Sequence, residues 1–209
     1  MSYLKVRPTR MELINLRRRL RLVERAKDLL KDKENALVTE FLRALREYLA
    51  VKEELREALE KLRTYVGLAE IESSSLNLEE IVLLRGEAYR LEAYVRNVMG
   101  VKVPSFKLSK VEEVKVSRNL ISLPLYVAKL VKEGDRMLNA LISLLSLELE
   151  LRELALEIFK TRRRANALEY VISPELKKVI KEIEMTLEER EREDIYRLRR
   201  VLSLGPSVP

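Results

Sequence analysis

Residues 9–66 read TRMELINLRRRLRLVERAKDLLKDKENALVTEFLRALREYLAVKEELREALEKLRTYV and contain neither Gly nor Pro. Apolar side chains recur there in alternating steps of three and four, which is the heptad pattern of a coiled-coil helix. The mean step of 3.5 residues predicts a left-handed supercoil with a partner, over roughly 87 Å of helix. We call the repeating positions the seam, which consists of Leu13, Leu16, Leu20, Val23, Lys27, Leu30, Glu34, Leu37, Phe41, Ala44, Tyr48, Val51, Leu55, Ala58, Leu62, Tyr65 and Ala69.

The composition agrees with a coiled coil and argues against enzyme chemistry. Charged residues make up 36% of the chain and aromatic residues only 5%, as in long helical proteins. The chain has no His and no Cys, which removes the commonest general base, the thiolate nucleophile and the usual metal ligands. Its five Gly residues are isolated, so no glycine-rich phosphate loop is present. We therefore expect no active site, no cofactor and no metal.

The net charge of +7 leaves several classes of partner open. Nucleic acid or an anionic membrane surface would both attract such a chain. However, acids interrupt every basic face, and a helix surface rich in ion pairs explains the same composition. No apolar run reaches the ~18 residues of a membrane span, and the first ten residues lack an apolar signal core. These features predict a cytoplasmic protein.

The ends of the first helix are indicated by local residues. Thr9 is placed to cap the helix, and Glu12 three residues later completes a capping-box pattern. The first helix is predicted from about Thr9 to Val66 and has no breaker before Gly67. The serines at 73–75 and Asn77 mark its end or a loop just past it.

The middle of the chain, residues 71–119, changes character and is predicted to be an insertion. Residues 78–86 fit either helical turns or a strand. From Tyr89 the apolar period becomes two, which predicts a β-hairpin at about residues 89–106 that leans on the helices. Leu91, Ala93 and Val95 share one face of it, and Pro104 limits the second strand to an edge. The turn is predicted at Asn97, Met99 and Gly100.

A second long helix is predicted from about Leu120–Pro124 to Leu202. Residues 137–158 are apolar around much of the helix and should be buried on more than one side. A narrower stripe follows at Ala165, Ile172, Leu176, Val179, Ile183 and Leu187. The predicted fold is all-α dominated: residues 1–70 and 120–204 form a long antiparallel coiled coil, the shaft, and residues 205–209 form a flexible tail.

Charge predicts how the two helices are aligned. Residues 9–25 carry a net charge of +4 and residues 182–194 a net charge of −5. If the helices end flush, facing residue numbers sum to about 209, which brings these two stretches together. Pro174 then faces about residue 35, near the polar seam positions Lys27 and Glu34. Since Pro removes a backbone hydrogen bond and clashes with the carbonyl of Tyr170, we predict a kink or loosened segment there.

Three separated stretches resemble a known family. The first stretch contains VRPTRMEL (6–13), LRRRL (16–20) and LLKDK (29–33), and the second is RNVMGV (96–101). The third contains RRRANALEY (162–170), EIEM (182–185) and EERER (188–192). Together these are similar to the D subunit of archaeal A-type and vacuolar V-type rotary ATPases. The resemblance covers essentially the whole chain.

The resemblance implies a non-catalytic rotor in the central stalk. Both chain ends would lie inside the hexamer of A and B subunits, with the F subunit along the stalk and the C subunit (called d in eukaryotes) toward the membrane ring. The complex would sit peripherally at the cytoplasmic face of the membrane. On this basis we expect contacts with the hexamer at eight charged residues: Arg10, Arg17, Arg18, Arg21, Glu189, Arg192, Arg197 and Arg200. The alternatives are a free-standing coiled-coil scaffold or adaptor and a nucleic-acid-binding coiled coil.

Overall fold

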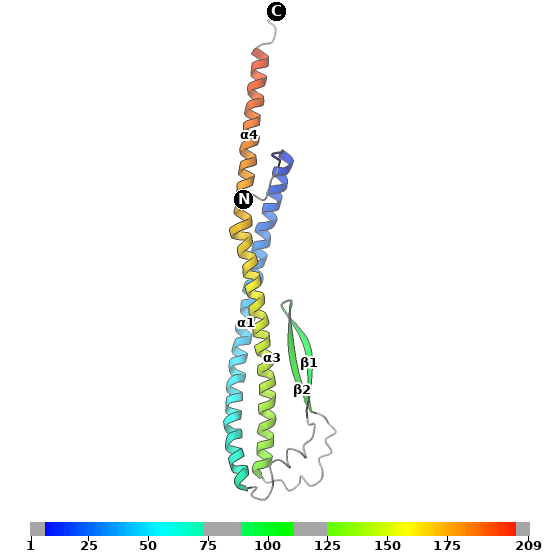
Figure 1. The fold of residues 1–209 in the computed structure, drawn as a ribbon, viewed down its shortest axis with the longest axis vertical. Helices are drawn as coiled ribbons and strands as arrows, with labels where there is room; N and C mark the ends of the chain where they lie inside the picture. Colours follow the sequence, from blue (N-terminus) through cyan, green and yellow to red (C-terminus); the bar gives the residue numbers. More distant parts are fainter. Residues whose placement is uncertain (1–6, 73–88, 111–124, 204–209) are drawn as a thin grey trace, which may run out of the picture. The chain divides into compact units, whose positions relative to one another are not determined.

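The computed structural model describes residues 7–72, 89–110 and 125–203 (Figure 1). The predictions for residues 78–86, 120–124 and 205–209 fall outside these ranges. The elements are helix α1 (Arg10–Glu72), strands β1 (Tyr89–Val98) and β2 (Val101–Lys110), helix α3 (Leu125–Ala167), π-helix η2 (Leu168–Ile172) and helix α4 (Ser173–Ser203). The predicted fold, a long antiparallel helix pair with a small β-hairpin, is confirmed. The division into shaft, insertion and tail stays a prediction.

The chain separates into two compact units. The first comprises Met1–Asn35 with Phe159–Pro209, and the second comprises Ala36–Ile158. The first unit therefore holds the start of α1 with the end of α3, η2 and α4. The second holds the rest of α1, the hairpin and most of α3.

The start of α1 is capped as the sequence predicts. The backbone N–H of Glu12 donates to the Thr9 hydroxyl oxygen at 3.3 Å, and the N–H of Leu13 donates to the Thr9 carbonyl at 3.1 Å. The first bond satisfies one of the four N–H groups that a helix start leaves without partners, and the second is the first regular hydrogen bond of the helix.

The seam of α1 is the buried side of the helix. Every seam position from Leu13 to Ala69 is buried or half-buried, including the polar residues Lys27 and Glu34. Leu16 and Leu37 are almost completely inaccessible. The heptad pattern therefore identified the packed face of α1 over its whole length.

The predicted end of α1 near Val66 is wrong, because the helix continues through Gly67 to Glu72, directly before the serines that were expected to mark its end or a loop just past it. A glycine costs a helix interior only about 1 kcal/mol relative to alanine. Ala69, one turn further on, is completely buried. Burial of the last seam residue thus outweighs the local preference of Gly67 for a break.

The core of the first unit joins α1 to α4. Leu16 packs in one cluster with Leu176, Val179, Ile180 and Ile183, all of them buried. The half-buried residues that flank this cluster are Leu13, Leu20, Val23 and Leu187.

Ion pairs in the first unit fix the alignment of the two helices. Arg10 contacts Glu191 and Arg17 contacts Glu184, so facing residue numbers sum to 201. The predicted flush alignment with a sum of about 209 is therefore wrong. Helix α4 continues twelve residues past Glu191, about 18 Å of helix. Charge attraction selected the right stretches, but the end of a helix is not fixed by its partner's end.

The second long helix is interrupted by η2, which the sequence did not predict as a π-helix. The Ser173 N–H donates to the Leu168 carbonyl, five residues earlier. Pro174 follows immediately and has no N–H to offer, and its ring disfavours a regular α-turn against the Tyr170 carbonyl. The wider π-turn accommodates both effects. Whether the helix axis also kinks here stays a prediction.

The π-turn changes the spacing of buried positions. From Thr161 one row of buried or half-buried residues passes through Ala165, Glu169 and Ser173 in steps of four, and Leu168 and Glu175 beside this row are also half-buried. Ile172, which was predicted to belong to the buried stripe, is 39% exposed. A widened turn needs more residues to return to the same side, and this moves Ile172 off the packed face.

The hairpin is longer than predicted and turns more tightly. Strands β1 and β2 pair antiparallel from Tyr89 with Lys110 to Val98 with Val101. Only Met99 and Gly100 form the turn, both with positive φ (51° and 84°), as a type I′ hairpin turn requires. Asn97 lies within β1, opposite Lys102, so it is not a turn residue.

The hairpin contacts α3 within the second unit. The Arg96 guanidinium pairs with the Glu150 carboxylate, and the Tyr89 hydroxyl donates to Asp135. The Phe106 N–H donates to the Ser146 hydroxyl at 3.0 Å. Because α3 meets the hairpin as well as α1, residues 137–158 need more than one packed side, as predicted.

Replacing Leu16 with Ala should destabilise the chain by about 2–5 kcal/mol, the usual cost of truncating a fully buried leucine. Leu29→Ala is the matched control, since Leu29 lies on the same helix but is 69% exposed. Denaturant-induced unfolding followed by circular dichroism measures both. Equal losses for the two variants would show that Leu16 does not belong to a packed core.

The Arg96–Glu150 pair should respond asymmetrically to mutation. The Glu150 side chain is 5% exposed and that of Arg96 is 51% exposed. Arg96→Ala leaves a carboxylate without its partner in a site closed to water, which should cost about 1–3 kcal/mol. Glu150→Gln leaves Arg96 in solvent and should cost less. Unfolding of both variants and of the double variant tests this, and a larger loss for Glu150→Gln would contradict it.

Candidate functional site

Two of the predicted contact residues hold the helices of the first unit together. The Arg10 Nη2 lies 2.5 Å from Glu191 Oε1, and the Arg17 Nη2 lies 2.6 Å from Glu184 Oε1. These side chains are substantially exposed, and such a pair contributes only about 0.2–1 kcal/mol. Their main effect is to set the alignment of α1 and α4.

Other predicted contact residues point away from the helix pair. Arg18, Arg21, Glu189 and Arg200 are all exposed. Within the described part of the chain, their side chains have no ion-pair partner. They are therefore available to another protein.

The remaining two predicted residues pair along α4 itself. Arg192 lies 3.7 Å from Glu188, and Arg197 lies 3.4 Å from Glu193. Both pairs span four residues, the spacing at which side chains meet on one helix face. These contacts are weak and can be exchanged for others.

The end of α4 carries exposed apolar side chains among its charges. None of the described residues of α1 faces it beyond Glu191, because Arg10 is already level with that residue. Exposed apolar side chains on one helix end, in this number, mark an interaction surface. They are Ile195, Tyr196, Leu198, Val201 and Leu202.

Of the two polar seam positions, Glu34 lies near an opposite charge on the other helix, whereas Lys27 pairs with Asp28 of its own helix at 3.4 Å. Glu34 lies 3.9 Å from Arg162 of α3, and Lys31 lies 2.9 Å from Glu169 of η2. The alignment that joins Arg17 to Glu184 places Pro174 level with Lys27 rather than with about residue 35. The Lys31–Glu169 pair was missed by the sequence analysis, and the correct alignment would have found it.

The two groups of this pair change each other's pKa. The hydrogen bond from Lys31 holds the pKa of the Glu169 carboxyl below its ordinary value. The same bond raises the pKa of the Lys31 ammonium. Each group therefore favours the charged form of the other, as expected of an ion pair.

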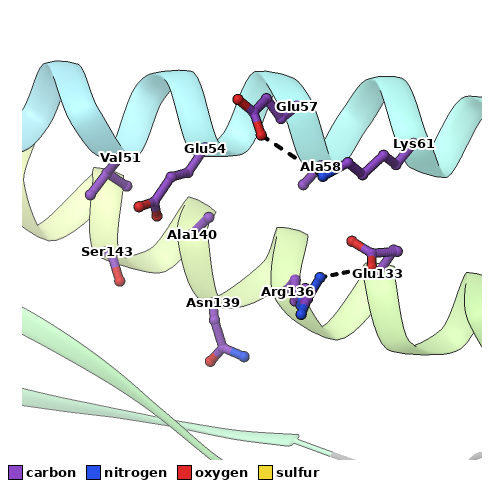
Figure 2. A pocket seen from close by; sticks show the side chains of 10 residues that line it. All are labelled: Val51, Glu54, Glu57, Ala58, Lys61, Glu133, Arg136, Asn139, Ala140 and Ser143. Carbon is purple, nitrogen blue, oxygen red and sulfur yellow. Dashed lines mark hydrogen bonds and ion pairs between the residues drawn. The ribbon is translucent and has the colours of Figure 1, made fainter.

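A groove of about 440 Å³ lies between α1 and α3 in the second unit (Figure 2). It exists because Ala58, Ala140 and Ser143 are too small to fill the space between the helices. Figure 2 shows Glu57 paired with Lys61 and Glu133 paired with Arg136, each along its own helix. The described residues contain no cluster of three or more ligand-type side chains that could hold a metal ion.

Among the helices of the described ranges, none combines the length and the apolar character that a membrane span demands.

Comparison with known proteins identifies the family. The model of the family described as the D subunit of ATP synthase matches residues 12–203. The A-type ATP synthase D subunit of Pyrococcus furiosus is 41% identical over 203 residues, covering 96% of this chain and 95% of that protein. The A-type ATP synthase D subunit of Thermococcus kodakarensis is 40% identical over 206 residues, covering 96% of this chain and 95% of that protein. That of Thermoplasma acidophilum is 36% identical over 200 residues, covering 94% of this chain and 92% of that protein.

The chain belongs to the ATP synthase D-subunit family. The matched span starts in the first turn of α1 and ends at Ser203, the last residue of α4. It therefore includes the seam, the hairpin, η2 and the exposed end of α4. The resemblance inferred from the sequence motifs is confirmed, and the alternatives of a free-standing scaffold and a nucleic-acid binder have no support.

The Lys31–Glu169 pair predicts a pH-dependent stability. Because the Glu169 pKa is lowered in the folded chain, its contribution is complete above about pH 4 and is lost as the pH falls through the lowered value. Because the Lys31 pKa is raised, its contribution is complete below about pH 10 and is lost as the pH rises through the raised value. The stability difference between the native chain and Glu169→Gln should be largest between these limits. The denaturant midpoints of the two chains, measured across the pH range, give this stability difference. If it is as large at pH 3 as at pH 7, the Lys31–Glu169 ion pair does not contribute to stability.

Proposed function

We propose that this chain is the central-stalk rotor of an A/V-type ATP synthase. Membership of the D-subunit family across α1, the hairpin and α4 carries this proposal. The chain is a non-catalytic part of that complex. It transmits torque between the catalytic hexamer of A and B subunits and the ion-translocating membrane ring.

The seam supports a mechanical role. A rotor must carry torque without its helices sliding past each other. Within the first unit, the Leu16 cluster resists sliding through burial, and the Arg10–Glu191 and Arg17–Glu184 pairs resist it through alignment. Displacing the helices by one turn would separate both ion pairs and unpack the cluster at the same time.

The exposed surfaces of the first unit support contact with the hexamer. Residues 195–202 combine apolar and basic side chains on a helix that has no partner in the described chain. We assign hexamer contacts first to Arg18, Arg21, Glu189 and Arg200, which have no ion-pair partner among the described residues. Arg192 and Arg197 exchange weak pairs within α4 for contacts with the hexamer, whereas Arg10 and Arg17 serve mainly to align the helices.

The remaining partners and the location follow from the same proposal. The F subunit would lie along the stalk, and the C subunit (called d in eukaryotic complexes) would connect it to the membrane ring. The rotor would sit at the cytoplasmic face of the cell membrane as a peripheral part of the complex.

Two double variants separate torque transmission from stability. Arg18→Gln with Arg21→Gln should lower ATP-driven rotation or coupling in the reconstituted complex severalfold, with the chain's own unfolding unchanged. The matched control is Arg10→Gln with Arg17→Gln, which removes the same number of positive charges. It should destabilise the isolated chain by up to about 1–2 kcal/mol, because each pair is exposed.

Rotation of single complexes and denaturant unfolding measure the two effects. Normal coupling with Arg18 and Arg21 both replaced would overturn their assignment. Failure of the native chain to co-purify with A and B subunits from native membranes would overturn the proposed function itself.

A further inference from the structure

The hairpin presents an apolar face to solvent. By the strand register, the buried residue Val103 shares a face with Arg96, which contacts α3. The alternate residues of β1 lie on the opposite face. Of these, Leu91 is 53% and Val95 is 67% exposed, and Ala93 between them is also exposed. From Leu91 to Val95 this side of β1 is therefore exposed, although Tyr89 at the start of the same side contacts Asp135 of α3.

The same three residues also direct their backbone groups outward. In a two-residue hairpin, Val98 and Val101 form a hydrogen-bonded pair, and bonded and non-bonded pairs then alternate along the strands. Leu91, Ala93 and Val95 fall at non-bonded positions. Their N–H and C=O groups therefore point away from β2, and within the described chain β1 pairs with β2 alone.

Among the described residues, the outer edge of β2 is protected, whereas no element covers that of β1. On β2, the outward N–H of Phe106 donates to Ser146, and Pro104 at another outward position has no N–H. Proline and a covering element are the usual ways in which proteins close a sheet edge. Strand β1 has no proline and no inward-pointing charge among its outward residues. Because one edge of the hairpin is closed and the other is open, we infer that the open edge of β1 pairs with a strand of another protein.

Charge and hydrogen bonding narrow the class of partner. The 22 residues of the hairpin carry five cationic side chains and one carboxylate, a net charge of +4. Two copies of the hairpin would repel each other. A lipid bilayer would leave the outward N–H and C=O groups of β1 without hydrogen bonds, at several kcal/mol each. An extended segment of an acidic protein satisfies the charge, the apolar face and the backbone groups together.

We propose that β1 is a docking edge for an extended strand of an acidic partner protein within the assembled complex. The strand pairs with the backbone of Leu91, Ala93 and Val95 and places alternate apolar side chains over their exposed face. The inference rests on the proposed function, because the complex supplies the partner.

Amide hydrogen exchange resolved to single residues tests the docking edge. In the isolated full-length chain, the amides of Glu92, Tyr94 and Arg96 should exchange slowly, since they bond to β2. Those of Leu91, Ala93 and Val95 should exchange fast. In the complex, the outward set should slow by roughly tenfold or more. Unchanged fast exchange in the complex would overturn the proposal, and so would slow exchange already present in the isolated chain.

A substitution pair links the protection to the edge itself. Ala93→Pro removes one outward N–H without removing a β1–β2 hydrogen bond, and Ala93→Val keeps that N–H. Complexes with Ala93→Val should retain slow exchange at Leu91 and Val95, whereas Ala93→Pro should lose it. Slow exchange at Glu92 and Tyr94 verifies that the hairpin is intact in both variants. Protection that survives Ala93→Pro in an intact hairpin would overturn the proposal.

Two further measurements separate the sources of protection. Phosphatidylglycerol vesicles added to the isolated chain should leave the outward amides fast, and protection by vesicles alone would assign the edge to a membrane instead. Assembly of Ala93→Pro with the A and B subunits should persist. If the native chain assembles with the A and B subunits but the amides of Leu91, Ala93 and Val95 still exchange fast, the docking edge is wrong. The proposed function is not affected by that result.

Discussion

The structure depends on covering a single apolar stripe that runs along α1. Each fully buried large apolar side chain contributes about 1.5–3 kcal/mol, several times more than an exposed ion pair. Few seam residues are as inaccessible as Leu16 and Leu37, and most are half-buried. Stability is therefore spread along the helix, and no single position dominates. The charged flanks add little energy, yet they decide which turn of α4 lies beside which turn of α1.

Regular patterns in the sequence predicted the features that repeat. The heptad positions identified the packed side of α1, the period of two identified the hairpin, and Thr9 identified the helix start. Predictions failed where one local residue competed with packing. Gly67 suggested a helix end that burial of Ala69 overrides, and Pro174 suggested a loosened segment without revealing that the chain forms a π-turn before it. The helix propensity of a residue can be read from the local sequence. Whether burial of neighbouring side chains outweighs that propensity depends on the helix that packs against them.

The candidate contact residues show the same division. Their presence on the two helix ends followed from charge and from family motifs. Some of them form pairs that align the helices, such as Arg17 with Glu184, and others point outward, such as Arg18. This division became visible only with the observed alignment of the two helices, which is shifted by eight residues from the flush alignment expected from the sequence. The hairpin face was also beyond sequence reasoning, because alternation defines two faces but does not say which meets α3. Each face sends one side chain to α3, Arg96 to Glu150 and Tyr89 to Asp135, and only the exposed fractions show that Leu91 and Val95 lie in solvent.

The π-turn at Leu168–Ile172 has a consequence for how chain length can vary. The hydrogen bond from the Ser173 N–H to the Leu168 carbonyl spans five residues, so this turn holds one residue more than a regular α-helical turn. In a regular helix, one residue more or less rotates all later side chains by about 100°. A deletion between Leu176 and Ile183 would therefore turn the rest of the stripe away from α1. A deletion within η2 could instead be met by tightening the turn, so this short segment can absorb a change of length while the later side chains keep their rotational phase.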